Sequence, residues 1–140
     1  MAAVLPPEKR SANAVLLDRA GICVSALCLV QCLLLPIIVA GAPVLALPFF
    51  DSEIFHLLLL GLILPIGSIA FYLGYRVHAS RATVLLGAVG IGIVFVTAVF
   101  GHDHLSAMAS ALWTSLGGFF LITAHVMNLR NRRACLRPQP

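Results

Sequence analysis

Apolar residues along this chain fall into four long runs that are separated by short polar segments. The runs cover about 21–41, 54–75, 82–100 and 106–129. Each run has about 20 residues, which is the length that crosses a hydrocarbon core of about 30 Å. The strands of a membrane barrel would instead alternate in polarity over about ten residues. The pattern therefore predicts four transmembrane helices.

Three short connectors separate these runs: "LPFFDSE", "YRVHASR" and "GHDHLS". Connectors this short place each helix antiparallel beside the next one. We therefore expect an all-α membrane protein, a four-transmembrane-helix antiparallel bundle. The expected division is an N-terminal arm over 1–17, the bundle over 18–130 and a basic tail over 131–140, with no internal repeat and no soluble domain.

The composition supports a membrane location. Of the 140 residues, 61% are apolar and 10% are charged, whereas soluble domains average about 25% charged residues. A small soluble fold exposes much of its surface to water, and this chain has too few charges to cover that surface. Lipid is the solvent that fits its exterior.

The basic residues predict the orientation in the membrane. The first and third connectors contain no Lys or Arg, and all nine basic residues lie in the N-terminal segment, the second connector or the C-terminal segment. The positive-inside rule therefore places both termini in the cytoplasm. This distribution accounts for the net charge of +4 without a nucleic-acid partner, and the basic tail suits anionic lipid.

A cleavable signal peptide is an alternative interpretation of the first run. Ala40-Gly41-Ala42 resembles a cleavage site. The apolar run before it is about 20 residues long, however, whereas the apolar region of a signal peptide has about 7–15. We therefore expect the first run to remain as a transmembrane helix.

A pair of thiols in the first run is the main candidate for chemistry. Cys28 and Cys32 are four residues apart, so a helix places them one above the other on one face. Thiolate is a soft ligand that suits Hg(II), Cu(I) and Zn(II). Gln31 favours an inward orientation for this stretch. Pro36 has no backbone N–H that could donate to the Cys32 carbonyl. The alternative is that the two cysteines only pack as small apolar residues.

The cysteines are expected to be free thiols. Cys23, Cys28 and Cys32 share one helix, where parallel Cβ vectors make a disulfide strained. Cys135 lies in the predicted cytoplasmic tail, which is a reducing environment. Cys23 and Cys135 remain candidate ligands nearer the cytoplasm.

The histidines add two further candidates. His102, Asp103 and His104 form a compact "HDH" outside the membrane, where they could load Zn(II) or Cu(II) or simply be exposed polar residues. His125 lies inside the fourth run, and an intramembrane ionisable group is a functional candidate. It could equally reach the membrane surface or bond to Tyr72 or Tyr75.

Several segments together carry a resemblance to a known family. "DRAGICVSALCLVQCLLLP", the "FH" at the head of the second run, "GHDHL" and "AHVMNLRNRRAC" resemble the MerC family of bacterial mercuric-ion transport proteins of the inner membrane. The resemblance covers roughly 18–135 and implies four transmembrane helices that take Hg(II) from the periplasm to cytoplasmic thiols. It implies that Cys28 and Cys32 form the relay in the membrane and that Cys135 is a cytoplasmic acceptor.

Two departures from the family pattern broaden the expected substrate. The family's mercury transporters have adjacent cysteines in this helix and a cysteine pair at the cytoplasmic end, whereas here three residues intervene and Cys135 stands alone. We therefore expect a multi-pass inner-membrane carrier of a soft metal ion, Hg(II) first, with Cu or Zn as alternatives. No obligatory cofactor or enzymatic activity is expected. The expected partners are lipid, a cytoplasmic thiol acceptor protein and a second copy of the chain.

Two other functions stay open at this point. His56 and His125 could hold haem or quinone in a sensing module, although they lie near opposite faces of the bilayer. The chain could also be an accessory subunit whose cysteines only pack.

Overall fold

The computed structural model describes residues 7–41 and 53–136, and it is helical almost throughout. The helices are α1 (Pro7–Gly41), α2 (Glu53–His78), α3 (Arg81–His104) and α4 (Ala107–Leu136). All four contain segments that are long and apolar enough to cross a membrane. The predicted all-α, four-helix membrane architecture is thus confirmed.

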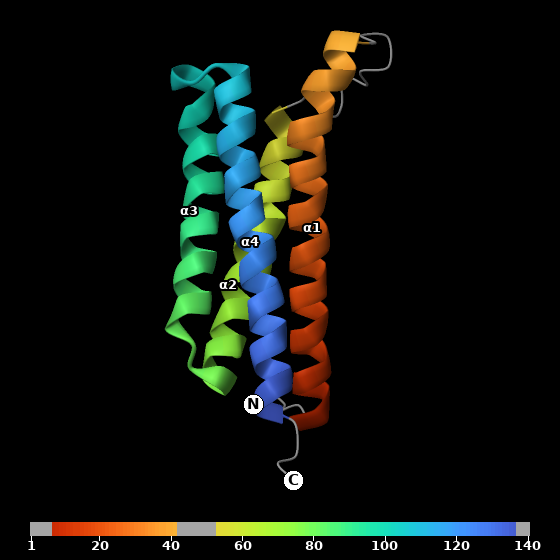
Figure 1. Ribbon diagram of the computed structural model, residues 1–140, viewed down its shortest axis with the longest axis vertical. Helices are drawn as coiled ribbons and strands as arrows, with labels where there is room; N and C mark the ends of the chain where they lie inside the picture. Colours follow the sequence, from red (N-terminus) through yellow and green to blue (C-terminus); the bar gives the residue numbers. More distant parts are fainter. Residues whose placement is uncertain (1–6, 42–52, 137–140) are drawn as a thin grey trace.

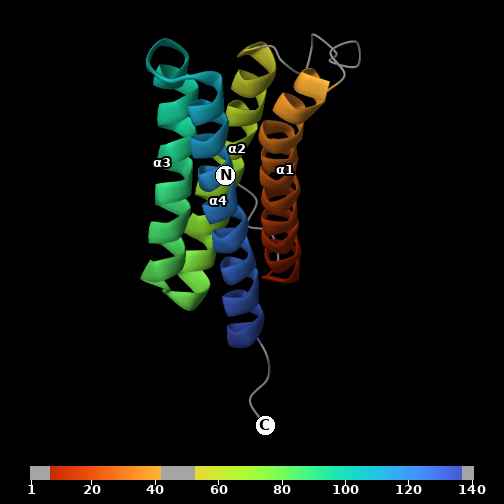
Figure 2. The same ribbon diagram turned by 45° about the horizontal axis from the view of Figure 1, so that its top comes forward.

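The four helices form an antiparallel bundle. Figures 1 and 2 show α1 and α3 on opposite sides, with α2 and α4 between them. Within the described residues α4 contacts each of the other three helices, whereas α1 and α3 do not touch. The start of α1 and the end of α4 lie at the same end of the bundle as the α2–α3 connection (Figure 1). Which side of the membrane this end faces stays a prediction from the basic residues.

Helices α1 and α4 are longer than the hydropathy pattern predicts. α1 has 35 residues and begins at Pro7, so most of the predicted N-terminal arm is helical. α4 runs to Leu136, so much of the predicted tail is helical too. At 1.5 Å per residue α1 is about 52 Å long, which is more than the hydrocarbon core needs. Hydropathy detects only the part in contact with lipid, and helix packing continues beyond it: Ala14 is already buried.

Capping side chains lie at the α2–α3 connection and at the α3–α4 connection, which are at opposite ends of the bundle. At the α2–α3 connection, Ala79 has φ 51°, and the Ser80 hydroxyl accepts from the Thr83 backbone N–H at 3.5 Å. At the opposite end, the Ser106 hydroxyl accepts from the Ala109 backbone N–H at 3.3 Å. Such caps satisfy the donors that a helix start leaves unpaired. They allow turns short enough to keep neighbouring helices antiparallel.

Within the described residues, two apolar clusters fill the interior. The larger one joins α2, α3 and α4 and consists of Leu60, Ile63, Phe71, Val94, Leu121 and Ala124. α3 and α4 approach closely beside it, because a Cβ on Gly90 would lie only 3.0 Å from the Gly117 carbonyl oxygen. The smaller cluster consists of Cys28, Cys32 and Leu59 and joins α1 to α2. Many large apolar side chains point outward instead, as expected for a surface solvated by lipid.

Candidate functional site

The inner face of α1 carries small and polar side chains rather than large apolar ones. Its buried positions recur at alternating intervals of three and four residues, so they form one stripe along the helix. These positions are Ala14, Asp18, Gly21, Ser25, Cys28 and Cys32, and Gln31 next to Cys32 is buried as well. Small residues are common where membrane helices pack, but Asp18, Cys28 and Cys32 in this stripe also bring potential ligands into the interior of the bundle.

The two central thiols lie together in this stripe. Cys28 is 3% exposed and Cys32 is 7% exposed, and both pack against Leu59 of α2. Their side chains are in hydrogen-bonding contact with each other, and neither cysteine forms a disulfide. Gln31 is buried beside them, which agrees with its predicted inward orientation. The structure thus brings together the pair that the sequence singled out, in the interior of the bundle.

The other two cysteines lie apart from this pair. Cys23 is exposed on the outer side of α1, and Cys135 is exposed near the end of α4. Cys135 therefore lies at the end of the bundle where α1 begins (Figure 1). Neither thiol joins the central pair in this conformation.

The predicted outer loading site is only partly described. His102, Asp103 and His104 form the last turn of α3, and His104 is exposed. The side chains of His102 and Asp103 lie outside the described residues, as does the side chain of His56. Among the described side chains, no three His, Cys, Asp or Glu residues come close enough to hold a metal ion together. The candidate ligands whose side chains are described, Cys23, Cys28, Cys32, His104, His125 and Cys135, therefore do not form a three-ligand site.

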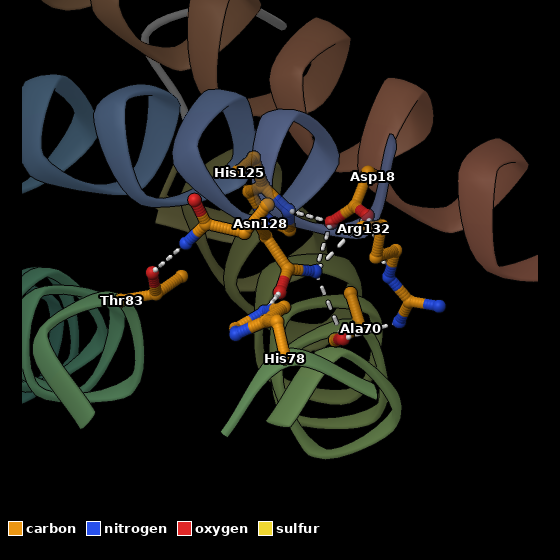
Figure 3. Close-up of polar contacts among 8 residues, drawn as sticks. Asp18, Ala70, His78, Thr83, His125, Asn128 and Arg132 are labelled. Atoms are coloured by element: carbon orange, nitrogen blue, oxygen red, sulfur yellow. Dashed lines mark hydrogen bonds and ion pairs between the residues drawn. The ribbon is translucent and has the colours of Figure 1, made fainter. Parts of the chain in front are cut away.

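A buried polar network occupies the end of the bundle nearest the α2–α3 connection. Figure 3 shows Asp18 of α1 facing His125, Asn128 and Arg132 of α4. Asp18 and Asn128 are 0% exposed, His125 is 1% exposed and Arg132 is 4% exposed. Charges buried this deeply require partners, because an unpaired charge is strongly disfavoured away from water.

Asp18 receives three partners from α4. Asn128 Nδ2 donates to Asp18 Oδ1 at 2.8 Å and to Oδ2 at 3.0 Å. His125 Nδ1 donates to Oδ1 at 3.1 Å, and Arg132 Nε forms an ion pair with Oδ2 at 3.5 Å. The carboxylate is therefore surrounded by donors from one helix and holds α1 against α4.

Asn128 extends this network to α2 and to the α2–α3 connection. Its Nδ2 also donates to the Ala70 carbonyl oxygen at 3.1 Å, and that oxygen accepts from Arg132 Nη2 at 3.2 Å. Asn128 Oδ1 accepts from His78 Nε2 at 2.7 Å, while His78 Nδ1 accepts from the Ser80 backbone N–H at 3.0 Å. The Asn128 side chain thus links α4 to α1 and α2. Through His78 it is also connected to Ser80, the N-cap residue of α3.

Two glycines provide the space that the network needs. A Cβ on Gly21 would overlap the His125 ring, and a Cβ on Gly74 would overlap the Asn128 amide. The His125 ring is also packed against Phe71, with 4.5 Å between the ring centroids. His125 and Asn128 therefore have one well-defined position each.

Sequence reasoning identified His125 but not the network around it. His125 neither reaches the membrane surface nor bonds to Tyr72 or Tyr75, because Asp18 is its partner. The sequence pattern marks Asp18 only as the first residue of the predicted bundle over 18–130. Its spacing from Ser25 and Cys32, seven residues each time, is the signal that places it on the same face as the thiols.

Comparisons with known proteins support a family assignment. A family model described as MerC mercury resistance protein matches residues 18–130, which is most of the chain and includes α2, α3 and the greater part of α1 and α4. The comparisons with curated proteins and with solved structures found no match.

Proposed function

Because the chain belongs to the MerC mercury resistance protein family, we propose that it carries Hg(II) through the bundle by exchange between thiols. The family indicates a multi-pass membrane protein of mercuric-ion transport in general. The finer proposal names Cys28 and Cys32 as the site that holds the ion in transit. The observation that carries it is that two thiols, neither of them in a disulfide, lie in contact inside a membrane-spanning bundle.

The chemistry of the pair suits a soft divalent ion. An ion that arrives as HgX₂, with X a chloride, hydroxide or small thiolate, exchanges both X ligands for the Cys28 and Cys32 sulfurs. Two S–H bonds are lost, two Hg–S bonds form, and each departing X takes one proton as HX. Two thiolates cancel the charge of a divalent cation, so the bound ion adds no net charge to a low-dielectric interior.

The stripe on α1 suggests the direction of the remaining path. From the thiol pair it continues through Ser25 and Gly21, against which the His125 ring lies, to Asp18. A carboxylate bonded to one imidazole nitrogen is the arrangement that orients a histidine for metal binding through its other nitrogen. We therefore propose His125 as the next ligand and Cys135, at the same end of the bundle, as the acceptor before a cytoplasmic thiol protein.

The polar network lies across the proposed path at its predicted cytoplasmic end. Asp18 lies ten residues from Cys28, which corresponds to about 15 Å along a helix. Its bonds to His125 and Asn128 hold α1 against α4 over this distance. Passage toward Cys135 requires these contacts to loosen, so transport is proposed to alternate between a closed and an open inner end. Entry from the periplasm past His102, Asp103 and His104 completes the proposed route.

Uptake of radioactive Hg(II) by cells that produce the protein tests this function. The double variant Cys28→Ser/Cys32→Ser is expected to reduce uptake to the level of cells without the protein. Cys23→Ser is the matched control, because Cys23 is an exposed thiol on the same helix, and it is expected to retain uptake. Equal uptake by the wild type and the double variant would refute the proposal.

A further inference from the structure

One buried hydroxyl near the centre of the bundle has no apparent use in the fold. Ser115 of α4 is 9% exposed, and its Oγ has no hydrogen-bond partner among the described residues. Buried hydroxyl groups nearly always have a partner, because leaving one unpaired loses the hydrogen bonds that water would have made. An unpaired hydroxyl in the interior therefore points to a group that the protein receives from outside.

The contacts of α4 place Ser115 beside the thiol pair. Gly118, three residues after Ser115, faces α1, since a Cβ there would lie 3.5 Å from the Ser25 carbonyl oxygen and 3.7 Å from Leu29 Cβ. Ala111, four residues before Ser115, packs against the cluster that contains Cys28 and Cys32. Residues at such intervals share one face of a helix. Ser115 therefore lies between these two contacts, on the face that α4 turns toward the thiols.

Neighbouring residues of α4 show that this face is distinct. Gly117 faces α3, because a Cβ there would lie 3.1 Å from the Gly90 carbonyl oxygen. The Ser110 hydroxyl donates to the Gly101 carbonyl oxygen of α3 at 3.5 Å. Ser110 thus has a structural partner on another helix, whereas Ser115 lies on the face that meets α1 and has no partner among the described residues.

We propose that Ser115 Oγ is the third donor of the site, contacting the metal ion when Cys28 and Cys32 hold it. This inference rests on the proposed function, because it assigns an oxygen ligand to the same thiol site. The hydroxyl keeps its proton and donates a lone pair to the ion. The complex therefore stays neutral, with two thiolates on one divalent cation.

A hydroxyl suits a carrier better than a third thiol would. Oxygen is a hard and weak ligand for a soft ion, so it can fill a third position without holding the ion permanently. A third ligand that joins while another leaves is the requirement for handing an ion from one sulfur to the next. Ser115 would thus support exchange at the pair and gain the partner that it lacks among the described residues.

Replacing Ser115 by cysteine tests directly whether a side chain at this position contacts the bound metal ion. The test uses purified full-length protein with Cys23→Ser and Cys135→Ser, so that only the central thiols remain, loaded with one equivalent of HgCl₂ at mildly alkaline pH. In this background Ser115→Cys is expected to change the sulfur-to-mercury charge-transfer spectrum from that of a two-thiolate complex to that of a three-thiolate complex. Ser110→Cys is the matched control and is expected to keep the two-thiolate spectrum.

The outcomes separate this inference from the proposed function. If Cys28→Ser/Cys32→Ser binds Hg(II) as well as the unsubstituted pair, the thiol site itself is wrong. If the pair binds Hg(II) but Ser115→Cys keeps the two-thiolate spectrum, only the role of Ser115 is overturned. The same conclusion follows if Ser110→Cys changes the spectrum equally, since the change would then not depend on position.

Affinity gives a second measurement that does not require a new thiol. Ser115→Ala is expected to weaken Hg(II) binding by about threefold to tenfold in competition with a small thiol, the size of one modest polar contact. Ser115→Thr keeps the hydroxyl and is expected to retain the affinity. Equal binding by the alanine variant and the wild type would contradict the proposal.

Discussion

Asp18 of α1 and Asn128 of α4, 110 residues apart in the sequence, are joined by two hydrogen bonds of 2.8 and 3.0 Å in the interior of the bundle. The same Asn128 amide bonds to a carbonyl oxygen of α2 and to His78. A side chain shared by so many partners leaves several of them unsatisfied when it is removed. This relationship makes the polar network a fixed point at which α1, α2 and α4 are held together.

Replacement of Asn128 tests the importance of that fixed point. Asn128→Ala is expected to destabilise the protein by about 1–3 kcal/mol, because it leaves buried polar groups without partners. Thr123→Val is a suitable control, since the Thr123 hydroxyl bonds only within its own helix, to the Phe119 carbonyl oxygen at 2.8 Å. Reversible unfolding in mixed micelles measures both variants. A loss for Asn128→Ala no larger than that for Thr123→Val would show that the network is not important for stability.

The ion pair between Asp18 and Arg132 predicts non-additive substitutions. Arg132→Met leaves Asp18 buried with less charge compensation, and breaking a buried pair in this way costs about 3–5 kcal/mol. The double variant Asp18→Asn/Arg132→Met removes both charges and is expected to be more stable than Arg132→Met alone. Arg133→Met changes the exposed neighbour and is expected to have little effect. Additive losses in this double-mutant cycle would mean that the two charges do not interact.

Glycine substitutions test the close packing of the network. Gly21→Ala and Gly74→Ala place a methyl group against His125 and Asn128, and overpacking of this kind costs about 1–3 kcal/mol. Gly92→Ala is the matched control inside a helix, because a Cβ there meets nothing within 4 Å. It is expected to be neutral or to stabilise by up to about 1 kcal/mol. The packing account is wrong if all three variants have the same stability.

The amount of structure that could be predicted from the sequence depends on the physical signal involved. The four spans were predictable, because lipid solvation requires long apolar runs that any hydropathy pattern reveals. The extension of α1 back to Pro7 was not, since helix packing outside the hydrocarbon region leaves no hydropathy signal. The cysteine pair was predictable from its spacing, and its burial agrees with the inward orientation that Gln31 indicated.

The polar network and Ser115 illustrate what sequence patterns miss. The proximity of Asp18 to Asn128 depends on how α1 and α4 are aligned, which neither helix determines alone. Ser115 lies in an ordinary stretch of a transmembrane helix, where serine is common as a small residue. Two features distinguish it from such residues. Its hydroxyl is buried without a described partner, and it lies on the face of α4 that meets α1.

Labelling of the cysteines tests both burial and orientation. Cys135 is exposed at the end of α4, whereas Cys28 and Cys32 are buried. A membrane-impermeant maleimide is expected to modify Cys135 in inverted membrane vesicles and to leave Cys28 and Cys32 unmodified. In right-side-out vesicles Cys135 is expected to be protected. Modification of Cys135 from the outside would reverse the orientation predicted by the basic residues.

Transport by the purified protein tests the central claim most directly. The measurement is uptake of radioactive Hg(II) into liposomes that contain only this protein and an internal pool of glutathione. The wild type and Cys23→Ser are expected to accumulate the ion faster than protein-free liposomes, and Cys28→Ser/Cys32→Ser is expected to match the protein-free rate. Uptake by the double variant at the wild-type rate would contradict the account.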